Sequence, residues 1–171
     1  MGMDFPVLVV GPTTAPVHLV SCGQHPAAHF ALNLIMPIAP DIPAAETAIV
    51  ELTNALRAEH GLNTLTQSTQ LAAAARAYAA KLARTNAFSH TVGGTTPSSR
   101  AKKAGYAFCQ IAENLAALYD SRGFTARNYA ERAVQGWENS PGHLKNMLTP
   151  HVTEISVAIA RAPLPDAKYV A

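Results

Sequence analysis

The chain has 171 residues, a length that suits one domain with an additional segment. Hydrophobic residues make up 49% of it and aromatic residues only 6%, so alanine and aliphatic side chains must fill most of the core. The formal net charge is +2, and the basic residues are spread along the chain. This excludes the basic stripe expected of a nucleic-acid-binding protein.

Residues 1–43 are rich in Pro, Ala and apolar side chains and lack Lys and Arg, the first of which is Arg57. Their run AAHFALNLIMPIAP is interrupted by Asn33 and Pro37 and is shorter than the ~20 residues that cross a bilayer, so we expect no membrane span. The run LVSC, ending at Cys22, is similar to a lipoprotein cleavage box, but no basic residues precede it. Two interpretations stay open: a degenerate export leader, or a disordered or misassigned N-terminus.

Residues 44–171 are predicted to form a single domain that begins with two helices. Ile49, Leu52 and Leu56 recur at helical spacing, and Gly61 is a typical residue at a helix end. A longer helix is predicted over residues 68–86. Its apolar stripe consists of Leu71, Ala75, Tyr78 and Leu82.

Two further helices and several strands follow. Thr96-Pro97 predicts a helix start and Gly105 its end, because proline suits the first helical turn. A helix over residues 125–139 should turn one face inward, composed of Ala126, Ala130, Ala133, Val134 and Trp137. Alternation in EISVAIA predicts a strand, and shorter extended stretches are predicted at residues 108–111 and in the final KYVA. This order of helices and strands indicates an α+β layered domain.

Three polar clusters stand out from this alanine-rich background. They are FSHTVGG with His90, AEN with Glu113 and Asn114, and WENSPGH with His143. Two imidazoles and a carboxylate, each at an element end, are the side chains of a metal site or an acid–base site. Ser-Pro-Gly should stop the preceding helix and hold His143 on a turn. Cys22 and Cys109 are too few for a disulfide framework, and we expect Cys109 to be a partly buried lone thiol.

Taken separately, each polar residue has a structural alternative. His90 can bond the carbonyls at the end of its helix, and Glu113 can be a solvated loop residue. Asn114 can fix a turn through its side chain, and His143 can lie on a surface loop. Trp137 is in register with the inward-facing alanines, so we expect it in the core.

Taken together and in order, the motifs resemble a known family. NALRAEHGLNTL, LAAAARAYAAKLARTNAFSH, RAKKAGY, AENLA, WENSPGHLKNML and TEISVAIA are similar to the bacterial, SCP-like branch of the CAP superfamily, which groups cysteine-rich secretory proteins, antigen-5 allergens and pathogenesis-related proteins. The resemblance runs from about Glu46 to the C-terminus. It implies a three-layer α-β-α sandwich with a small antiparallel sheet and a broad cleft on one side.

The resemblance also implies a set of cleft residues. It places His90, Glu113 and His143 in the cleft, where they would bind zinc or another divalent metal weakly, with water as a further ligand. Asn114, Ser140 and Gly142 would support the cleft or its turn. Ser140 occupies the position where eukaryotic members have a second glutamate. The disulfides of those members are absent here.

Three functions follow as hypotheses. The first is a monomeric binding module for a lipid, sterol, glycan or peptide, secreted or held in the cell envelope, in which any metal is structural or regulatory. The second is a zinc-dependent hydrolase of peptide or cell-wall bonds with Glu113 as general base. Because one glutamate cannot easily be both ligand and base, and no HExxH motif is present, we expect a non-enzyme. The third is a structural or interaction domain with a vestigial cleft.

Overall fold

The computed structural model describes residues 39–162 and 169–171. The predictions for residues 1–38, among them the export leader and Cys22, lie outside the described residues. The first described helix begins at Ile42, and Asp41 caps it by accepting a hydrogen bond from the backbone N–H of Ala44. Within the described ranges, no helix is both long enough and apolar enough to cross a membrane.

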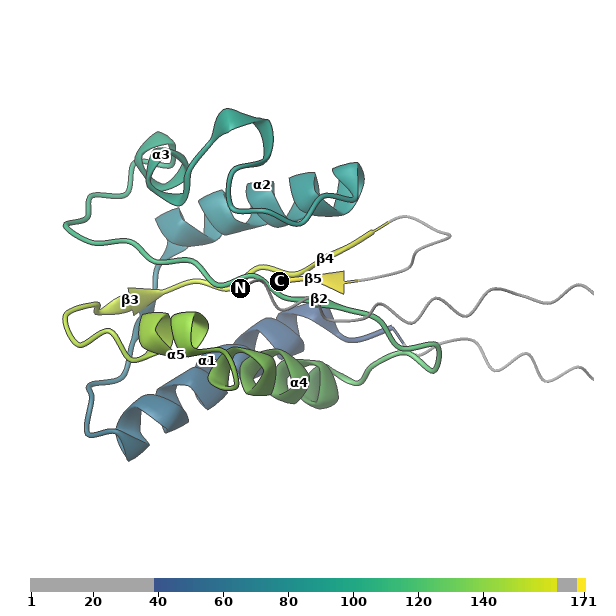
Figure 1. The fold of residues 1–171 in the computed structure, drawn as a ribbon, viewed down its shortest axis with the longest axis horizontal. Helices are drawn as coiled ribbons and strands as arrows, with labels where there is room; N and C mark the ends of the chain where they lie inside the picture. The colour runs from purple at the N-terminus through teal and green to yellow at the C-terminus, as the bar shows by residue number, and fades with distance from the viewer. Residues whose placement is uncertain (1–38, 163–168) are drawn as a thin grey trace, which may run out of the picture. The chain divides into compact units, whose positions relative to one another are not determined.

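The helices predicted from periodicity are present, close to their predicted ends, and they form two layers around the strands. The described elements are, in order, α1 (Ile42–Glu59), β1 (Thr66–Gln67), α2 (Thr69–Thr85), the 3-10 turn η1 (Val92–Gly94), α3 (Pro97–Lys103), β2 (Ala117–Leu118), α4 (Ala126–Glu138), α5 (Pro141–Met147), β3 (Glu154–Ile155), β4 (Ala160–Arg161) and β5 (Tyr169–Val170). In Figure 1, α2 and α3 lie on one side of β2, β4 and β5, and α1, α4 and α5 lie on the other. The predicted α-β-α sandwich is therefore confirmed.

The helix ends follow from local sequence. The Ser68 hydroxyl accepts a hydrogen bond from the backbone of α2, and Asn86 ends that helix in the left-handed region, at φ 50°. Gly61 and Gly105 follow α1 and α3 with φ values of 68° and 78°, a conformation that favours glycine. Both predicted glycine helix ends are confirmed.

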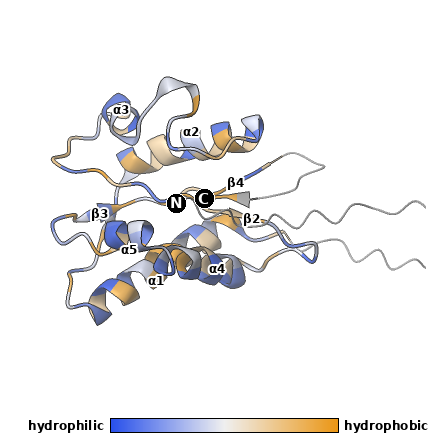
Figure 2. Ribbon diagram, viewed as in Figure 1, coloured by the Kyte–Doolittle hydropathy of each residue, from blue (hydrophilic) through white to orange (hydrophobic). Residues whose placement is uncertain are grey.

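The layer of α1 and α4 contains the larger core cluster. Four residues of the predicted inward face of α4 are buried and the fifth, Ala126, is half-buried. Trp137, one of the buried four, donates its indole N–H to the Leu115 carbonyl at 3.0 Å. Ala45 and Ile49 of α1 belong to the same core cluster, and both are fully buried. Figure 2 shows hydrophobic and hydrophilic residues interspersed along α1, α2 and α4, as expected of helices with one buried face. On the other face of the strands, α2 packs through a second cluster: Tyr78, Leu82, Leu115 and Val170.

The strands are short and form two separate pairings. β2, β5 and β4 make an antiparallel sheet with β5 in the middle, so the final strand predicted from KYVA is confirmed. β1 pairs with β3 in parallel. The strand predicted over residues 108–111 is wrong, since these residues are irregular and the strand lies later, at β2.

The single strand predicted from EISVAIA is also wrong, because it is divided into β3 and β4. Between β3 and β4, hydrogen bonds that involve side chains take the place of the backbone bonds between strands. Ser156 donates its hydroxyl to the Ser68 carbonyl at 2.6 Å, and the backbone N–H of Ile159 donates to a Glu46 carboxylate oxygen at 2.9 Å. These bonds hold the segment between the two sheets.

Arg57 is a charged residue in the core that the sequence analysis did not single out. It is fully buried, and its guanidinium donates to the carbonyls of Asn63, Met147 and Thr149 at 2.9, 2.8 and 3.0 Å. A longer contact of 3.5 Å reaches the carbonyl of Val152. Burial lowers the pKa of Arg57. The side chain thus ties α1 to the end of α5 and to the loop that leads into β3.

Candidate functional site

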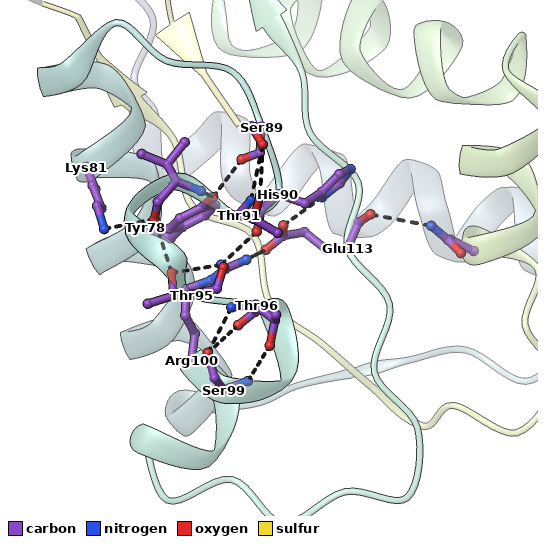
Figure 3. A network of polar contacts seen from close by, with 12 residues as sticks. Tyr78, Lys81, Ser89, His90, Thr91, Thr95, Thr96, Ser99, Arg100 and Glu113 are labelled. Atoms are coloured by element: carbon purple, nitrogen blue, oxygen red, sulfur yellow. Dashed lines mark hydrogen bonds and ion pairs between the residues drawn. The ribbon is translucent and has the colours of Figure 1, made fainter.

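Two of the three predicted cleft residues are in direct contact. The imidazole Nδ1 of His90 lies 2.8 Å from one carboxylate oxygen of Glu113, and the guanidinium of Arg100 lies 2.5 Å from the other. Figure 3 shows the Glu113 carboxylate between these two partners. The side chain of His90 is 48% exposed, whereas those of Glu113 and Arg100 are 20% and 11% exposed. The cluster therefore has one solvent-facing member, the imidazole.

The loop that carries His90 is fixed from α2. Tyr78 donates its hydroxyl to the Ser89 carbonyl at 2.6 Å and accepts the backbone N–H of Val92 at 3.0 Å. Lys81 donates to the Val92 carbonyl at 2.9 Å. Ser89 and Val92, on either side of His90, are thus both anchored to α2. The alternative in which His90 only caps its helix is not needed, because Asn86 ends α2 and the His90 ring contacts Glu113.

Arg100 joins this loop to α3. Its guanidinium donates to the His90 carbonyl at 3.0 Å and to the Thr95 carbonyl at 3.2 Å. The guanidinium carbon also lies 3.4 Å from the centroid of the Tyr78 ring, in a cation–π contact. Arg100 and Tyr78 are site residues that sequence reasoning missed. Their part in the site depends on how α3 lies against the loop before it, and residue spacing alone does not reveal this.

The third predicted cleft residue, His143, lies on a different element. Pro141 is the first residue of α5, so the Ser-Pro-Gly sequence begins a helix and does not form the predicted turn. His143 is in the first turn of that helix. Ser140 is the N-cap residue, without a side-chain capping bond, and Gly142 has an ordinary helical backbone with no positive φ.

Asn114 connects the Glu113 segment to α5. Its amide donates to the His143 carbonyl at 3.1 Å, and its oxygen accepts the Asn146 amide at 2.9 Å. Asn146 also contacts the Glu113 carbonyl at 3.4 Å. Asn114 therefore joins the Glu113 segment to α5 through its side chain and does not fix a turn within its own segment; its role in supporting a cleft stays a prediction. Nδ1 of His143 is buried and has no hydrogen-bond partner among the described residues.

The expected metal ligands do not form a metal site in this arrangement. Nδ1 of His90 and its Glu113 oxygen are at hydrogen-bond distance from each other, and the second oxygen is engaged by Arg100. In residues 39–162 and 169–171, no group of three or more His, Cys, Asp and Glu side chains is placed to hold one metal ion. The set of His90, Glu113 and His143 stays a prediction.

A large pocket lies next to the cluster, in the space between the two helical layers. Its volume is about 740 Å³. Most of its lining is apolar, and α2 contributes a row of small and medium side chains: Leu71, Ala74, Ala75, Tyr78, Ala79 and Leu82. Trp137 lies in the wall, and Arg100, Glu113, Asn114 and Asn146 supply polar groups. A pocket of about 300–1,000 Å³ with few polar groups is typical of small-molecule sites.

One part of the pocket wall is the irregular segment after α3. Tyr106 donates its hydroxyl to Glu154 of β3 at 2.6 Å, and its ring stacks on Phe108 with the centroids 6.2 Å apart. This hydrogen bond, together with partial burial and the carboxylate charge, raises the pKa of Tyr106 to about 12. Cys109 in the same segment is a free, exposed thiol, which corrects the expectation that it is partly buried. The carboxylate of Glu154 is thus engaged by the Tyr106 hydroxyl at the pocket wall.

Comparison with known proteins agrees with the family resemblance. The model of the cysteine-rich secretory protein (CAP) family matches residues 50–169. YkwD, an uncharacterized protein of Bacillus subtilis, is 33% identical over 140 residues, which are 80% of this chain and 51% of that protein. YlbC, an uncharacterized membrane protein of the same bacterium, is 30% identical over 119 residues, 68% of this chain and 32% of that protein. The chain spans about half the length of the first relative and a third of the second.

Two solved structures are similar in fold. An extracellular protein containing an SCP domain, from Bacillus anthracis, has a TM-score of 0.60 and 28% identity, over 78% of this chain and 43% of that one. An outer surface protein of Borrelia burgdorferi has a TM-score of 0.64 and 26% identity, over 79% of this chain and 93% of that one. With a family model that matches residues 50–169 and a relative that is 33% identical over 140 residues, the chain belongs to the cysteine-rich secretory protein family.

Proposed function

We propose that this chain is a binding module of an exported protein and that its ligand is a lipid or sterol, held with its apolar body in the 740 Å³ pocket. The pocket is the observation that carries the proposal. Its wall includes Leu71, Ala75 and Trp137, so a ligand that fills it would remove apolar surface from water on both sides. A glycan would place its hydroxyls against these side chains without hydrogen-bond partners.

The polar groups of the pocket suit the head of such a ligand. Asn114 and Asn146 bond to each other and to backbone carbonyls, and Glu113 lies beside them. A small group of polar side chains in an apolar wall can fix the orientation of a bound molecule. Export is supported by the relatives, one described as extracellular and one as an outer surface protein.

The two other hypotheses have less support. A hydrolase with Glu113 as general base needs a free carboxylate oxygen, but both oxygens are engaged by His90 and Arg100. A purely structural domain does not call for a pocket of this size between its layers. Hydrolysis of a labelled peptide or cell-wall substrate would favour the first of these, and a folded domain without a saturable ligand would favour the second.

Titration with a fatty acid and with a sterol tests the proposal. Trp137 is the only tryptophan of the chain and lies in the pocket wall, so its fluorescence reports on the occupied pocket. The titration uses the full chain in the presence of a chelator. We expect saturable one-to-one binding of at least one of the two ligands.

A matched pair of variants locates the site. Ala75→Phe places a ring in the pocket, whereas Ala73→Phe makes the same change at an exposed position of the same helix. We expect Ala75→Phe to weaken binding by about tenfold or more and Ala73→Phe to leave it unchanged, because only the first competes for the ligand's space. Equal effects of the two variants, or no saturable binding by the folded wild type, would reject the proposal.

A further inference from the structure

We infer that Arg100 supplies the positive charge that holds Glu113 and His90 together. This cluster is therefore stable without a metal ion and excludes Zn²⁺ from the site. Arg100 is thus a positioning residue. The inference goes beyond ligand binding in the apolar pocket and does not depend on it. It rests on the contacts that surround one carboxylate.

The first step is the placement of Arg100. Its side chain is 11% exposed, and its guanidinium contacts Glu113, the His90 carbonyl and the face of Tyr78 (Figure 3). A planar guanidinium suits such a site because its several N–H groups bond in fixed directions while its face stacks on an aromatic ring. The positive charge is therefore built into the site by three independent contacts.

The second step is the state of the Glu113 carboxylate. One oxygen contacts Arg100, and the other lies 2.8 Å from Nδ1 of His90. Two ligand atoms bound to one tetrahedral zinc at about 2.0–2.1 Å lie roughly 3.3 Å apart, so Nδ1 and this oxygen must separate before both can bind one ion. A divalent cation would also meet the repulsion of the guanidinium at close range.

The third step is the missing partner. His143 contributes its backbone carbonyl to Asn114, and its ring is not part of the His90–Glu113 contact. Among the side chains of residues 39–162 and 169–171, an ion at Glu113 would have only the His90 imidazole as a second ligand beside it. With Arg100 neutralising the carboxylate, the cluster needs no external cation to be electrostatically satisfied.

Metal titration of the full chain tests the inference. After removal of metal, wild type, Glu113→Gln and Arg100→Gln are titrated with Zn²⁺ by calorimetry. The relevant signal is saturable one-to-one binding that depends on Glu113, because other His and Cys side chains of the chain also attract zinc. We expect no such signal in wild type. We expect Arg100→Gln to show Glu113-dependent Zn²⁺ binding at least about tenfold tighter than the weakest binding that the wild-type titration could have detected, since a repelling charge has been removed. Addition of Glu113→Gln to this variant should abolish the gain.

Two controls keep the outcome clear. Arg132→Gln removes an equal charge from a surface pair with Asp120 and should not change zinc binding. Thermal unfolding of wild type and of Glu113→Gln is compared with zinc and with chelator, and we expect zinc to change the two midpoints equally, because only an ion bound through Glu113 would raise that of wild type alone. A wild type that binds zinc or is stabilised by it in a way that Glu113→Gln abolishes, or a folded Arg100→Gln without any gain, would overturn the inference.

Discussion

Replacement of Arg57 by methionine should destabilise the domain strongly. The change keeps a long apolar stem but removes three hydrogen bonds of 2.8 to 3.0 Å to backbone carbonyls. The bond to Met147 is buried, and those to Asn63 and Thr149 are partly buried. The fourth contact, at 3.5 Å, is too long to count.

The magnitude follows from these environments. A hydrogen bond from a charged donor contributes about 1.5–3 kcal/mol, and a buried acceptor left without a partner costs about 1–3 kcal/mol. Water can reach the two partly buried carbonyls, so each of these should lose only ~0.5–1 kcal/mol. Relief of the buried charge offsets part of the loss. We therefore expect Arg57→Met to lower the free energy of unfolding by about 3 kcal/mol, a large share of the 5–15 kcal/mol typical of a domain.

Denaturant unfolding of the full chain, followed by circular dichroism, measures this change. Arg76→Met removes an exposed arginine of α2 and should stay within about 0.5 kcal/mol of wild type. Arg57→Lys should lie between wild type and Arg57→Met, because one ammonium cannot bond three carbonyls on separate segments. An Arg57→Met variant that loses less than ~1 kcal/mol, or gains stability, would show that the hydrogen bonds of Arg57 do not stabilise the domain.

Two further predictions concern the pocket wall and the site support. Because the bond to Glu154 raises the pKa of Tyr106 from 10.0 to about 12, its stabilising effect is complete below pH 10 and is lost as the pH rises toward 12. The stability difference between wild type and Tyr106→Phe should shrink over this range in denaturant titrations, and a constant difference would contradict the assignment. Asn114→Ala should cost about 1–2 kcal/mol, since it removes the bonds to His143 and Asn146, and unchanged unfolding would show that these bonds contribute nothing.

The helices could be predicted because their signals are local. Ser68, Asn86 and Gly105 lie at helix ends where capping chemistry requires them, and α4 repeats its buried face at helical spacing. The start of α5 also has a local signal in the sequence, Pro141. Proline is favoured at the first helical position, but the Ser-Pro-Gly sequence was interpreted only as a stop, which misplaced His143 on a turn.

The strands were harder to predict because their partners decide them. EISVAIA has the alternation of a strand, yet Ser156 donates its hydroxyl to the distant Ser68 carbonyl, and the backbone N–H of Ile159 donates to the side chain of the distant Glu46. β5 lies between β2 and β4, two elements far apart in the sequence. No local pattern encodes such pairings.

The candidate site was predicted in part. The family resemblance implied that His90 and Glu113 lie in one cleft as metal ligands, but their direct contact and the part played by Arg100 depend on how α3 lies against α2. The burial of Arg57 has a local signal in the sequence, since this residue continues the buried stripe of Ala45, Ile49 and Thr53 at intervals of four residues. The apolar pocket has no such signal, because its wall comes from segments that meet only in the folded domain.

A crystal structure of the full chain grown with a brominated fatty acid tests ligand binding in the pocket most directly. Bromine scatters anomalously, so its position is read without a model of the ligand. We expect a bromine peak inside the pocket, beside Leu71, Ala75 and Trp137. Bromine found only at His90 or on the outer surface, or absent at a saturating concentration, would contradict the claim that this domain binds an apolar ligand between its layers.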